Sequence, residues 1–435
     1  MSTDSGSVPA RAAAGSLPAT TAGRIDAAGG FAIAALAFAV PISTALANVA
    51  LVLVVACWVA GGSYRAKLRC WIEQPVALAA VLLFAWLCLS LLWAGGFGAD
   101  QARYLRKYAD LPLVAVFLWF CLHEPTRERA LQGFAAAMLL TLALSCAAAA
   151  GVLPAFSWLR AEPGNAVVFK LHITHGLLMA LAALLFHLNA RAARRPLARV
   201  LWSAAAALAL FNVLFMVQGR TGYLVIAAFV VLACAVRFGW RGLMLAAVAV
   251  TVAAGGLYQA SPALKQRVDK AIAEFSRWDR AQPAREEDSV GRRLEFYSVS
   301  SELVRQRPLL GYGLGNFPAA YRARVEGSGW LPTSNPHNEY LLLAVQAGLP
   351  AVALFLHLLA RMILAARGFA SERDRTLALA LPVWLATGCL VNALLIDHTE
   401  SLLFALLAGV LFARAAGTPS PVAEVAPAAA GAAAG

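Results

Sequence analysis

Charged residues are scarce in this chain of 435 residues, where Asp, Glu, Lys and Arg together make up 14%. A soluble domain carries nearer ~25%, whereas hydrophobic residues here reach 61% and the mean hydropathy is +0.69. The apolar residues form repeated runs of roughly 15–23 residues, the length that a helix needs to cross a hydrocarbon core about 30 Å thick. The shortage of charge therefore excludes an ordinary soluble protein and predicts an all-α integral membrane protein.

The small numbers of cysteine and of acidic residues restrict the class of protein further. The seven cysteines include no Cys-x-x-Cys pair, so neither a zinc site nor a disulfide framework is expected. The 23 acidic residues are outnumbered by 36 basic ones, and the net charge is +13. The basic residues mostly flank hydrophobic runs, where they set topology and meet anionic lipid headgroups. Membrane lipids, and not nucleic acid, are therefore the predicted partners of this charge.

The apolar runs predict about twelve transmembrane helices. They cover residues 30–46, 48–62, 75–94, 108–123, 130–151, 171–190, 200–217, 222–236, 242–258, 338–360, 376–396 and 401–414. Fifteen Lys and Arg residues occupy the short loops on one side, against six on the other. The richer side is expected to be cytoplasmic, which makes both termini cytoplasmic. Residues 1–29 and 416–435 are rich in small residues and are expected to be disordered.

A long polar insert, residues 259–336, separates helices one to nine (30–258) from helices ten to twelve (337–415). It would lie on the outer side of the membrane. Apolar residues recur in it at helical spacing over 264–275. A second helix is predicted to run to about Gln306, with Ser289 as its N-cap. The insert is therefore expected to form a helical loop domain.

Cations and imidazoles collect on the outer face beside this insert. Arg220 lies in a tight turn between two apolar runs, and His337 opens the tenth span. The other candidates are Lys170, His172, Arg292, Arg293, Asn338 and His398. Ionisable groups at a membrane boundary are costly and mark functional sites by default.

These residue types suit a reaction at a phosphate. Arginine offers a permanently charged planar fork for phosphate oxygens, and a neutral imidazole accepts a proton near physiological pH. We therefore predict that His337 deprotonates an attacking hydroxyl while Arg220 and its neighbours stabilise a departing phosphate.

Structural roles compete with these functional ones. Arg220 could be a topological anchor, but its turn is too short to need one and lies on the side poor in arginine. His337 could simply bond local backbone at a helix start; function is favoured for both. Arg292 and Arg293 on the sequence alone fit solvated charges. The two readings are evenly balanced for Lys170, His172 and His398.

Two further motifs are interpreted structurally. Residues 311–315 resemble a dinucleotide fingerprint, but no strand precedes them, so a flexible turn is predicted. The acidic run Glu286-Glu287-Asp288 fits charges that complement a helix N-terminus better than a metal site. No metal and no cofactor are predicted.

The single large outer loop and two motifs at its end resemble the O-antigen ligase family. The motifs are Arg307-Pro308-Leu309-Leu310-Gly311-Tyr312-Gly313-Leu314-Gly315-Asn316-Phe317 and Pro336-His337-Asn338-Glu339-Tyr340-Leu341. The resemblance covers roughly residues 30–415 and implies a GT-C-like enzyme of the bacterial inner membrane. Such an enzyme moves a glycan from undecaprenyl diphosphate, carrying O-antigen, to the lipid A–core oligosaccharide on the periplasmic side. The chemistry implied is inverting and independent of metal.

The resemblance also bears on residue roles and on alternatives. Family arginines and the family histidine match Arg220, Arg292 and His337, with Arg293 one position away. O-antigen polymerases tend to have two large outer loops, and protein O-oligosaccharyltransferases tend to be longer, so the ligase is favoured. A lipid-linked glycan transporter is an alternative of a different class. It would need polar or broken segments near mid-membrane, where Asn212 and Asn392 are the main polar residues.

Overall fold

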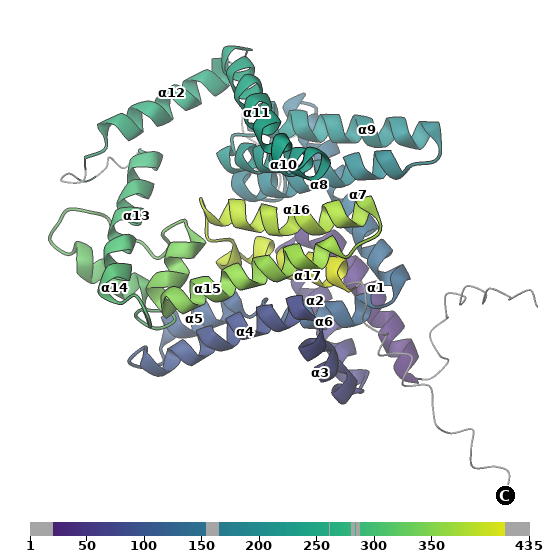
Figure 1. The fold of residues 1–435 in the computed structure, drawn as a ribbon, viewed down its shortest axis with the longest axis horizontal. Coiled ribbons are helices and arrows are strands. Elements are labelled where there is room, and N and C mark those ends of the chain that lie inside the picture. Colours follow the sequence, from purple (N-terminus) through teal and green to yellow (C-terminus); the bar gives the residue numbers. More distant parts are fainter. Residues whose placement is uncertain (1–20, 154–164, 261, 280–282, 284–287, 414–435) are drawn as a thin grey trace, which may run out of the picture.

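The computed structural model describes residues 21–153, 165–260, 262–279, 283 and 288–413, which are predominantly helical (Figure 1). The first half holds α1 (Thr21–Ile42), α2 (Thr44–Ala60), α3 (Tyr64–Glu73), α4 (Pro75–Leu89), η1 (Ser90–Trp93), α5 (Ala99–Tyr108), α6 (Leu113–Cys121), α7 (Glu124–Ala149), α8 (His172–Ala192) and α9 (Pro196–Phe211). The second half holds η2 (Asn212–Met216), α10 (Arg220–Phe238), α11 (Trp240–Ala260), α12 (Pro262–Arg277), α13 (Ser289–Gln306), α14 (Phe317–Val325), α15 (Glu339–Arg367), α16 (Glu372–Cys389), η3 (Leu394–Ile396) and α17 (His398–Phe412). No β-strand occurs in the described ranges, and the predicted all-α class is confirmed.

Seven of the described helices are long and apolar enough to cross a membrane, which is the pattern of a multi-pass protein. They are α1, α4 with η1, α7, α8, α9 with η2, α10 and α15. A helix also lies in each of the other five ranges where a span is predicted, namely α2, α6, α11, α16 and α17. These five are shorter or more polar, so the total of twelve spans stays a prediction.

The first helices break at a different place from the one that hydropathy predicts. α1 already begins at Thr21, so residues 21–29 are helical and the expectation of disorder there is wrong. α2 begins at Thr44 because Ser43 takes an extended conformation and its hydroxyl accepts a hydrogen bond from the amide of Leu46 at 3.4 Å. Hydropathy averages over such a cap and misses it. The predicted disorder of residues 1–20 and of the C-terminal tail lies outside the described residues.

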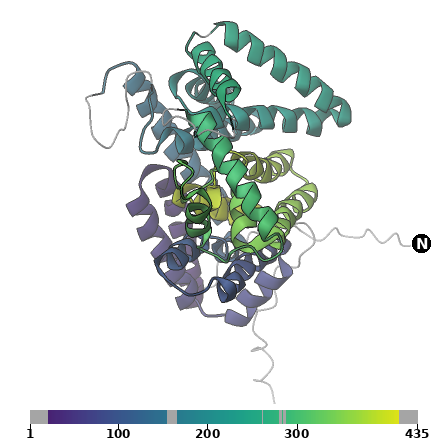
Figure 2. The same cartoon turned by 90° about the vertical axis from the view of Figure 1, so that its left-hand side faces the viewer.

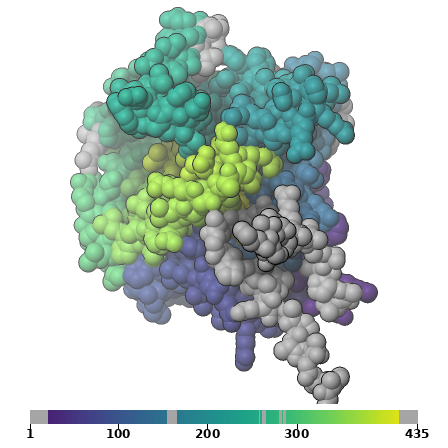
Figure 3. All heavy atoms as spheres, turned by 45° about the vertical axis from the view of Figure 1, so that its right-hand side comes forward, coloured from purple at the N-terminus to yellow at the C-terminus, as the bar shows by residue number. Residues whose placement is uncertain are grey.

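Helix α17 forms the centre of the bundle. Every residue from Thr399 to Phe412 is buried, and α17 packs against α6, α16 and α1. Apolar side chains on the outer helices are exposed instead, as on α2, where Val52 is 65% exposed, and on α11, where Val252 is 68% exposed. The space-filling view shows α15 and α16 filling the space between the earlier helices (Figure 3).

The polar insert contributes α12, α13 and α14, which gather at one end of the bundle (Figures 1 and 2). The helix predicted between Ser289 and Gln306 is confirmed, but its N-cap is Asp288, one residue before the one expected. The sequence analysis missed α14, although Pro318 in its first turn is a common start signal. Within the acidic run, Glu286 and Glu287 lie outside the described residues.

The glycine-rich segment 311–315 forms a turn, as the sequence suggested, but its backbone is tightly packed against other segments. Gly313 has φ +92°, and a Cβ atom there would lie 2.5 Å from the Cα of Ala94. The amide of Gly313 donates to the carbonyl of Gln346 at 2.7 Å, just before α15 breaks at Gly348. The segment therefore pairs with backbone carbonyls that the break in α15 frees, and glycine is needed because no side chain fits. This contact joins the loop domain rigidly to the bundle.

Candidate active site

His337 lies in the short linker that leads into α15, and its backbone is unusual. Its φ is +54°, a left-handed conformation that is uncommon outside glycine. Its amide donates to the side-chain oxygen of Asn335 at 2.8 Å. The next residue, Asn338, is the N-cap of α15; its Oδ1 accepts from the amide of Leu341 at 3.0 Å, and its Nδ2 donates to the carbonyl of Leu390 at 3.0 Å. Such backbone strain persists where surrounding contacts hold it and clusters at functional sites.

A chain of side chains orients the imidazole. Nδ1 of His337 lies 3.1 Å from Oδ1 of Asn392, and Nδ2 of Asn392 donates to Oδ2 of Asp397 at 3.0 Å. A carboxylate only accepts, so Asp397 turns the amide nitrogen of Asn392 toward itself and the amide oxygen toward His337. Nδ1 must therefore carry the proton, which leaves a lone pair on Nε2 of the neutral ring. His337 is prepared to act as a base through Nε2.

The surroundings keep His337 neutral. Its ring is half-buried and stacks on Phe296, with the centroids 6.1 Å apart and the planes at 27°. Burial is the largest cause that lowers its pKa, and the charges of Arg293 and Arg292 lower it further. The hydrogen bond to Asn392 and the charge of Asp397 oppose this shift. The net direction is downward, which favours the unprotonated form.

Two arginines interact electrostatically with His337, and a third interacts with one of them. Arg292 and Arg293 lie in the first turn of α13, and the guanidinium of Arg292 is 5.8 Å from the ring centroid of Phe296. Burial lowers the pKa of Arg293; the charge of Arg220 acts in the same direction, and Tyr297 opposes both. Arg293 therefore interacts electrostatically both with Arg220, on α10, and with His337. Like charges held this close favour binding of an anion among them.

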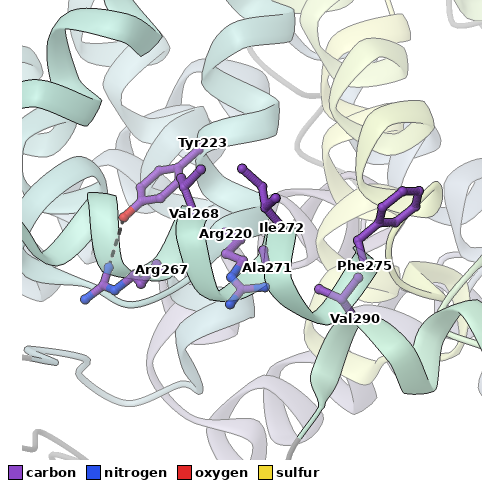
Figure 4. A pocket seen from close by; sticks show the side chains of 8 residues that line it. All are labelled: Arg220, Tyr223, Arg267, Val268, Ala271, Ile272, Phe275 and Val290. Carbon is purple, nitrogen blue, oxygen red and sulfur yellow. Dashed lines mark hydrogen bonds between the residues drawn. The ribbon is translucent and has the colours of Figure 1, made fainter. Parts of the chain in front are cut away.

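A cavity of about 440 Å³ opens beside Arg220 and has two different sides (Figure 4). Arg220, Tyr223 and Arg267 line one side of it, and Arg267 donates to the hydroxyl of Tyr223 at 3.2 Å, but the surface exposed inside the cavity is apolar. The amphipathic helix α12 and the start of α13 supply its apolar side, with Val268, Ala271, Ile272, Phe275 and Val290. Ile272 is 58% exposed and Phe275 is 62% exposed. Such a cavity suits the apolar chain of a ligand whose anionic head lies against Arg220.

The remaining candidates divide into two groups. His172 begins α8 and interacts electrostatically with Arg293. A Cβ atom on Gly219 would lie 2.6 Å from the carbonyl oxygen of His172, so the turn that carries Arg220 packs directly on this residue. Lys170 instead donates to the hydroxyl of Thr399 at 3.0 Å. Nε2 of His398 lies 2.8 Å from Oδ1 of Asn48 on α2. These two form a neighbouring polar group between α2 and α17.

A buried polar network supports the turn before Arg220. His175 bonds Asn212 through Nε2 and Oδ1 at 3.0 Å, and Nδ2 of Asn212 donates to Ser145 at 2.7 Å. Asn212 begins η2, a single π-helical turn of the kind often found at functional sites. The amide of Gln218 is then held by Asn165 at 3.1 Å. The sequence singled out Asn212 as a polar residue in a span but did not connect it to Arg220.

Other residues of the site were missed as well. The hydroxyl of Tyr297 lies 3.1 Å from the carbonyl oxygen of His337. Glu339 is fully buried; it accepts from Tyr108 at 2.7 Å and from the amide of Leu395 at 3.0 Å, which ties α15 to the segment that carries Asp397. Asp397 adjoins His398 in the sequence, and that adjacency was the one signal available.

No cluster of three or more His, Cys, Asp or Glu side chains able to hold a metal ion is found in the part of the chain that the structure describes. Asp288, the described residue of the acidic run, forms an ion pair with Arg277 at 3.7 Å. Whether the reaction needs a metal stays a prediction from the sequence.

The fold and this site define a multi-pass helical membrane protein with an oriented histidine and several arginines at one end of its bundle. A family model described as O-antigen ligase matches residues 204–356, which supports assignment of the chain to the O-antigen ligase family and confirms the resemblance seen in the sequence. The match contains Arg220, Arg292, Arg293 and His337.

Two other comparisons add little. No curated protein matches the chain. A chain of a peptidoglycan synthase complex, solved for the coordination of polymerization and crosslinking, is similar over 78% of this chain and 96% of its own length. Its identity is 19% and its TM-score is 0.44. A likeness at this level carries no functional argument.

Proposed function

We propose that this protein is an O-antigen ligase, which transfers a glycan from undecaprenyl diphosphate to the lipid A–core oligosaccharide. The observation that carries the proposal is an oriented His337 that interacts with Arg292 and Arg293, together with Arg220, which interacts with Arg293 and lines an apolar cavity. The family match is the second support. A lipid diphosphate combines the apolar chain that the cavity suits with an anionic head.

In the proposed reaction the acceptor hydroxyl gives its proton to Nε2 of His337. Its oxygen then attacks the anomeric carbon of the donor sugar, and the bond between that carbon and the diphosphate oxygen breaks with inversion. The electron pair stays with the diphosphate, where the arginines stabilise the growing charge. A diphosphate stabilised in this way needs no general acid. The proton on His337 is afterwards lost to water.

The polar groups of the site take different parts in this scheme. Arg220 and Arg293 hold the diphosphate, with Arg292 and His172 beside them, and Arg267 lies next to the first apolar segment of the lipid. Lys170 and His398 border the site and face anionic groups that approach from the side of α2. Asn338 acts through the backbone, because both ends of its amide are engaged within the protein. It is therefore a positioning residue for His337.

The proposal is tested with purified protein, undecaprenyl-diphosphate-linked glycan and lipid A–core. We expect glycan to appear on the lipid A–core and free undecaprenyl diphosphate to be released in equal amount, both detected by mass spectrometry. Longer lipid-linked glycan without acceptor glycosylation would instead identify a polymerase. Glycan on a protein acceptor would identify an oligosaccharyltransferase. Movement of intact donor across a vesicle membrane, with no transfer, would identify a transporter.

The proposed setting is the bacterial inner membrane, with the site on the periplasmic side and both termini in the cytoplasm. The bias of fifteen Lys and Arg residues to six supports this orientation. We expect a reporter enzyme that works only in the periplasm to be active when it is inserted at Gly327, in the loop domain. A reporter that works only in the cytoplasm should be active when it is inserted at Ala193, between α8 and α9. The reversed pattern would contradict the orientation and the access of periplasmic substrates to His337.

A further inference from the structure

The short helix α3 turns away from the span that precedes it. Its axis is bent by 113° from that of α2, which is close to perpendicular to a membrane-crossing helix. Gly62 and Ser63 make the turn, with φ values of +62° and +52°. A helix at this angle after an apolar span lies along the membrane surface and not across the bilayer.

The packing of α4 shows which surface this is. α4 starts at Pro75, directly after α3, and its other end contacts the loop domain, where Nε1 of Trp93 donates to the carbonyl of Leu310 at 2.8 Å. An α-helix rises about 1.5 Å per residue, so α4 and η1 together span most of the thickness of a bilayer between α3 and the loop domain. α3 therefore lies at the membrane surface opposite His337.

A buried lysine fixes α3 in this position. Lys67 is 1% exposed, and its ammonium group donates to the carbonyl of Trp58. The same group lies 4.8 Å from the ring centroid of Trp58, 5.5 Å from that of Tyr64 and 5.5 Å from that of Trp119 on α6. Cation–π contacts of this kind attract the ammonium group to each ring. Contacts within the protein therefore hold this face of α3 in place, and no ligand is needed.

The rest of α3 presents two exposed strips. Leu68 is 57% exposed and Ile72 is 58% exposed, one turn apart on one strip. Arg65 and Arg69, also one turn apart, are exposed on the adjacent strip. Trp58 and Trp71 stack beside the helix with centroids 5.6 Å apart. Tryptophan is enriched where a membrane meets water, and an amphipathic helix with basic and apolar strips is typical of binding to anionic lipid.

We propose that α3 is a binding site for anionic phospholipid in the leaflet opposite His337. Leu68 and Ile72 would contact the acyl chains, and Arg65 and Arg69 would bind the phosphate of the headgroup. The argument is charge complementarity combined with orientation, and it is independent of the proposed transfer reaction. A neutral zwitterionic lipid offers the same acyl chains without the net negative charge, so it should bind more weakly.

The test uses the full-length protein in detergent and measures binding of dioctanoyl phosphatidylglycerol by native mass spectrometry. Each arginine near an anionic surface raises the binding constant roughly fivefold, so R65Q/R69Q should weaken binding by about 30-fold. The matched control R305Q/R322Q removes two exposed arginines of the loop domain and should bind as the unaltered protein does. Dioctanoyl phosphatidylcholine should bind each protein weakly and equally.

Other outcomes would overturn the proposal. Unchanged phosphatidylglycerol binding by R65Q/R69Q would do so, and so would equal affinity of the unaltered protein for phosphatidylcholine. Competition by millimolar inorganic phosphate would show an anion site that does not recognise a lipid. A change of oligomeric state in R65Q/R69Q, with lipid binding intact, would mean that α3 contacts a second protein chain. Unfolding is excluded by comparing the thermal transitions of the two double variants.

Discussion

Replacing His337 with alanine should lower the turnover of glycan transfer by roughly 10²–10⁴-fold, the usual contribution of a general base. Binding of undecaprenyl diphosphate should change far less, because it depends mainly on the arginines. Both are measured on purified protein, transfer from initial rates at saturating donor and binding by titration. The unaltered enzyme should lose activity on its acidic side only below the ordinary range of histidine, because burial and nearby arginines lower the pKa of His337.

The matched control is His357→Ala, which removes an exposed imidazole from α15, the helix that follows His337, and should leave transfer unchanged. The acidic limb of the pH profile should disappear in His337→Ala, since the group whose protonation stops the reaction is gone. Near-normal turnover in that variant would refute the general-base role. Lost binding, with turnover recovered at saturating donor, would instead make His337 a ligand of the phosphate.

Arg220→Ala should lower transfer by at least about 10²–10³-fold, the cost of removing one donor that stabilises transition-state charge. The level of protein in the membrane should not change, because Arg220 is exposed at the first residue of α10. Arg220→Lys should also be severely impaired. A lysine ammonium is a point charge and cannot hold two phosphate oxygens as a planar guanidinium does.

Arg237→Ala provides the control for this series, since Arg237 is exposed at the far end of the same helix. It should transfer glycan normally. Full activity of Arg220→Lys would show that charge alone is required and that the bidentate geometry is not. Full activity of Arg220→Ala would remove Arg220 from the site and leave Arg293 and Arg292 as its cations.

The elements predicted best are those with a strong local signal. α13 runs from Ser289 to Gln306 as expected, because an acidic run precedes it and Arg307-Pro308 follows it. α14 was missed because nine residues with mixed polarity have little periodicity. The tight packing of the glycine-rich segment against the break in α15 was not predicted because it depends on residues far along the chain.

The residues of the candidate site likewise divide into those with a local signal in the sequence and those without one. Arg220 and His337 stand out in the sequence because each is an isolated ionisable group at the edge of an apolar run. Asn392 stands out only as a polar residue within a span, and its role is not predicted, since its contact with His337 joins residues 55 positions apart. Arg292 and Arg293 fit ordinary solvated charges on a helix until the fold packs α13 against α15 and brings Arg293 within electrostatic reach of Arg220.

Composition, hydropathy and the motifs around Arg220 and His337 were sufficient to predict the helical membrane class, the polar insert and the resemblance to the O-antigen ligase family. These are properties of short segments, because hydrophobic runs and helix signals act over a few turns of chain. Only the tertiary structure decided which cations meet, which nitrogen of His337 is free, and which residues line the cavity. Those outcomes depend on contacts between segments distant in sequence, whose energies no local pattern encodes.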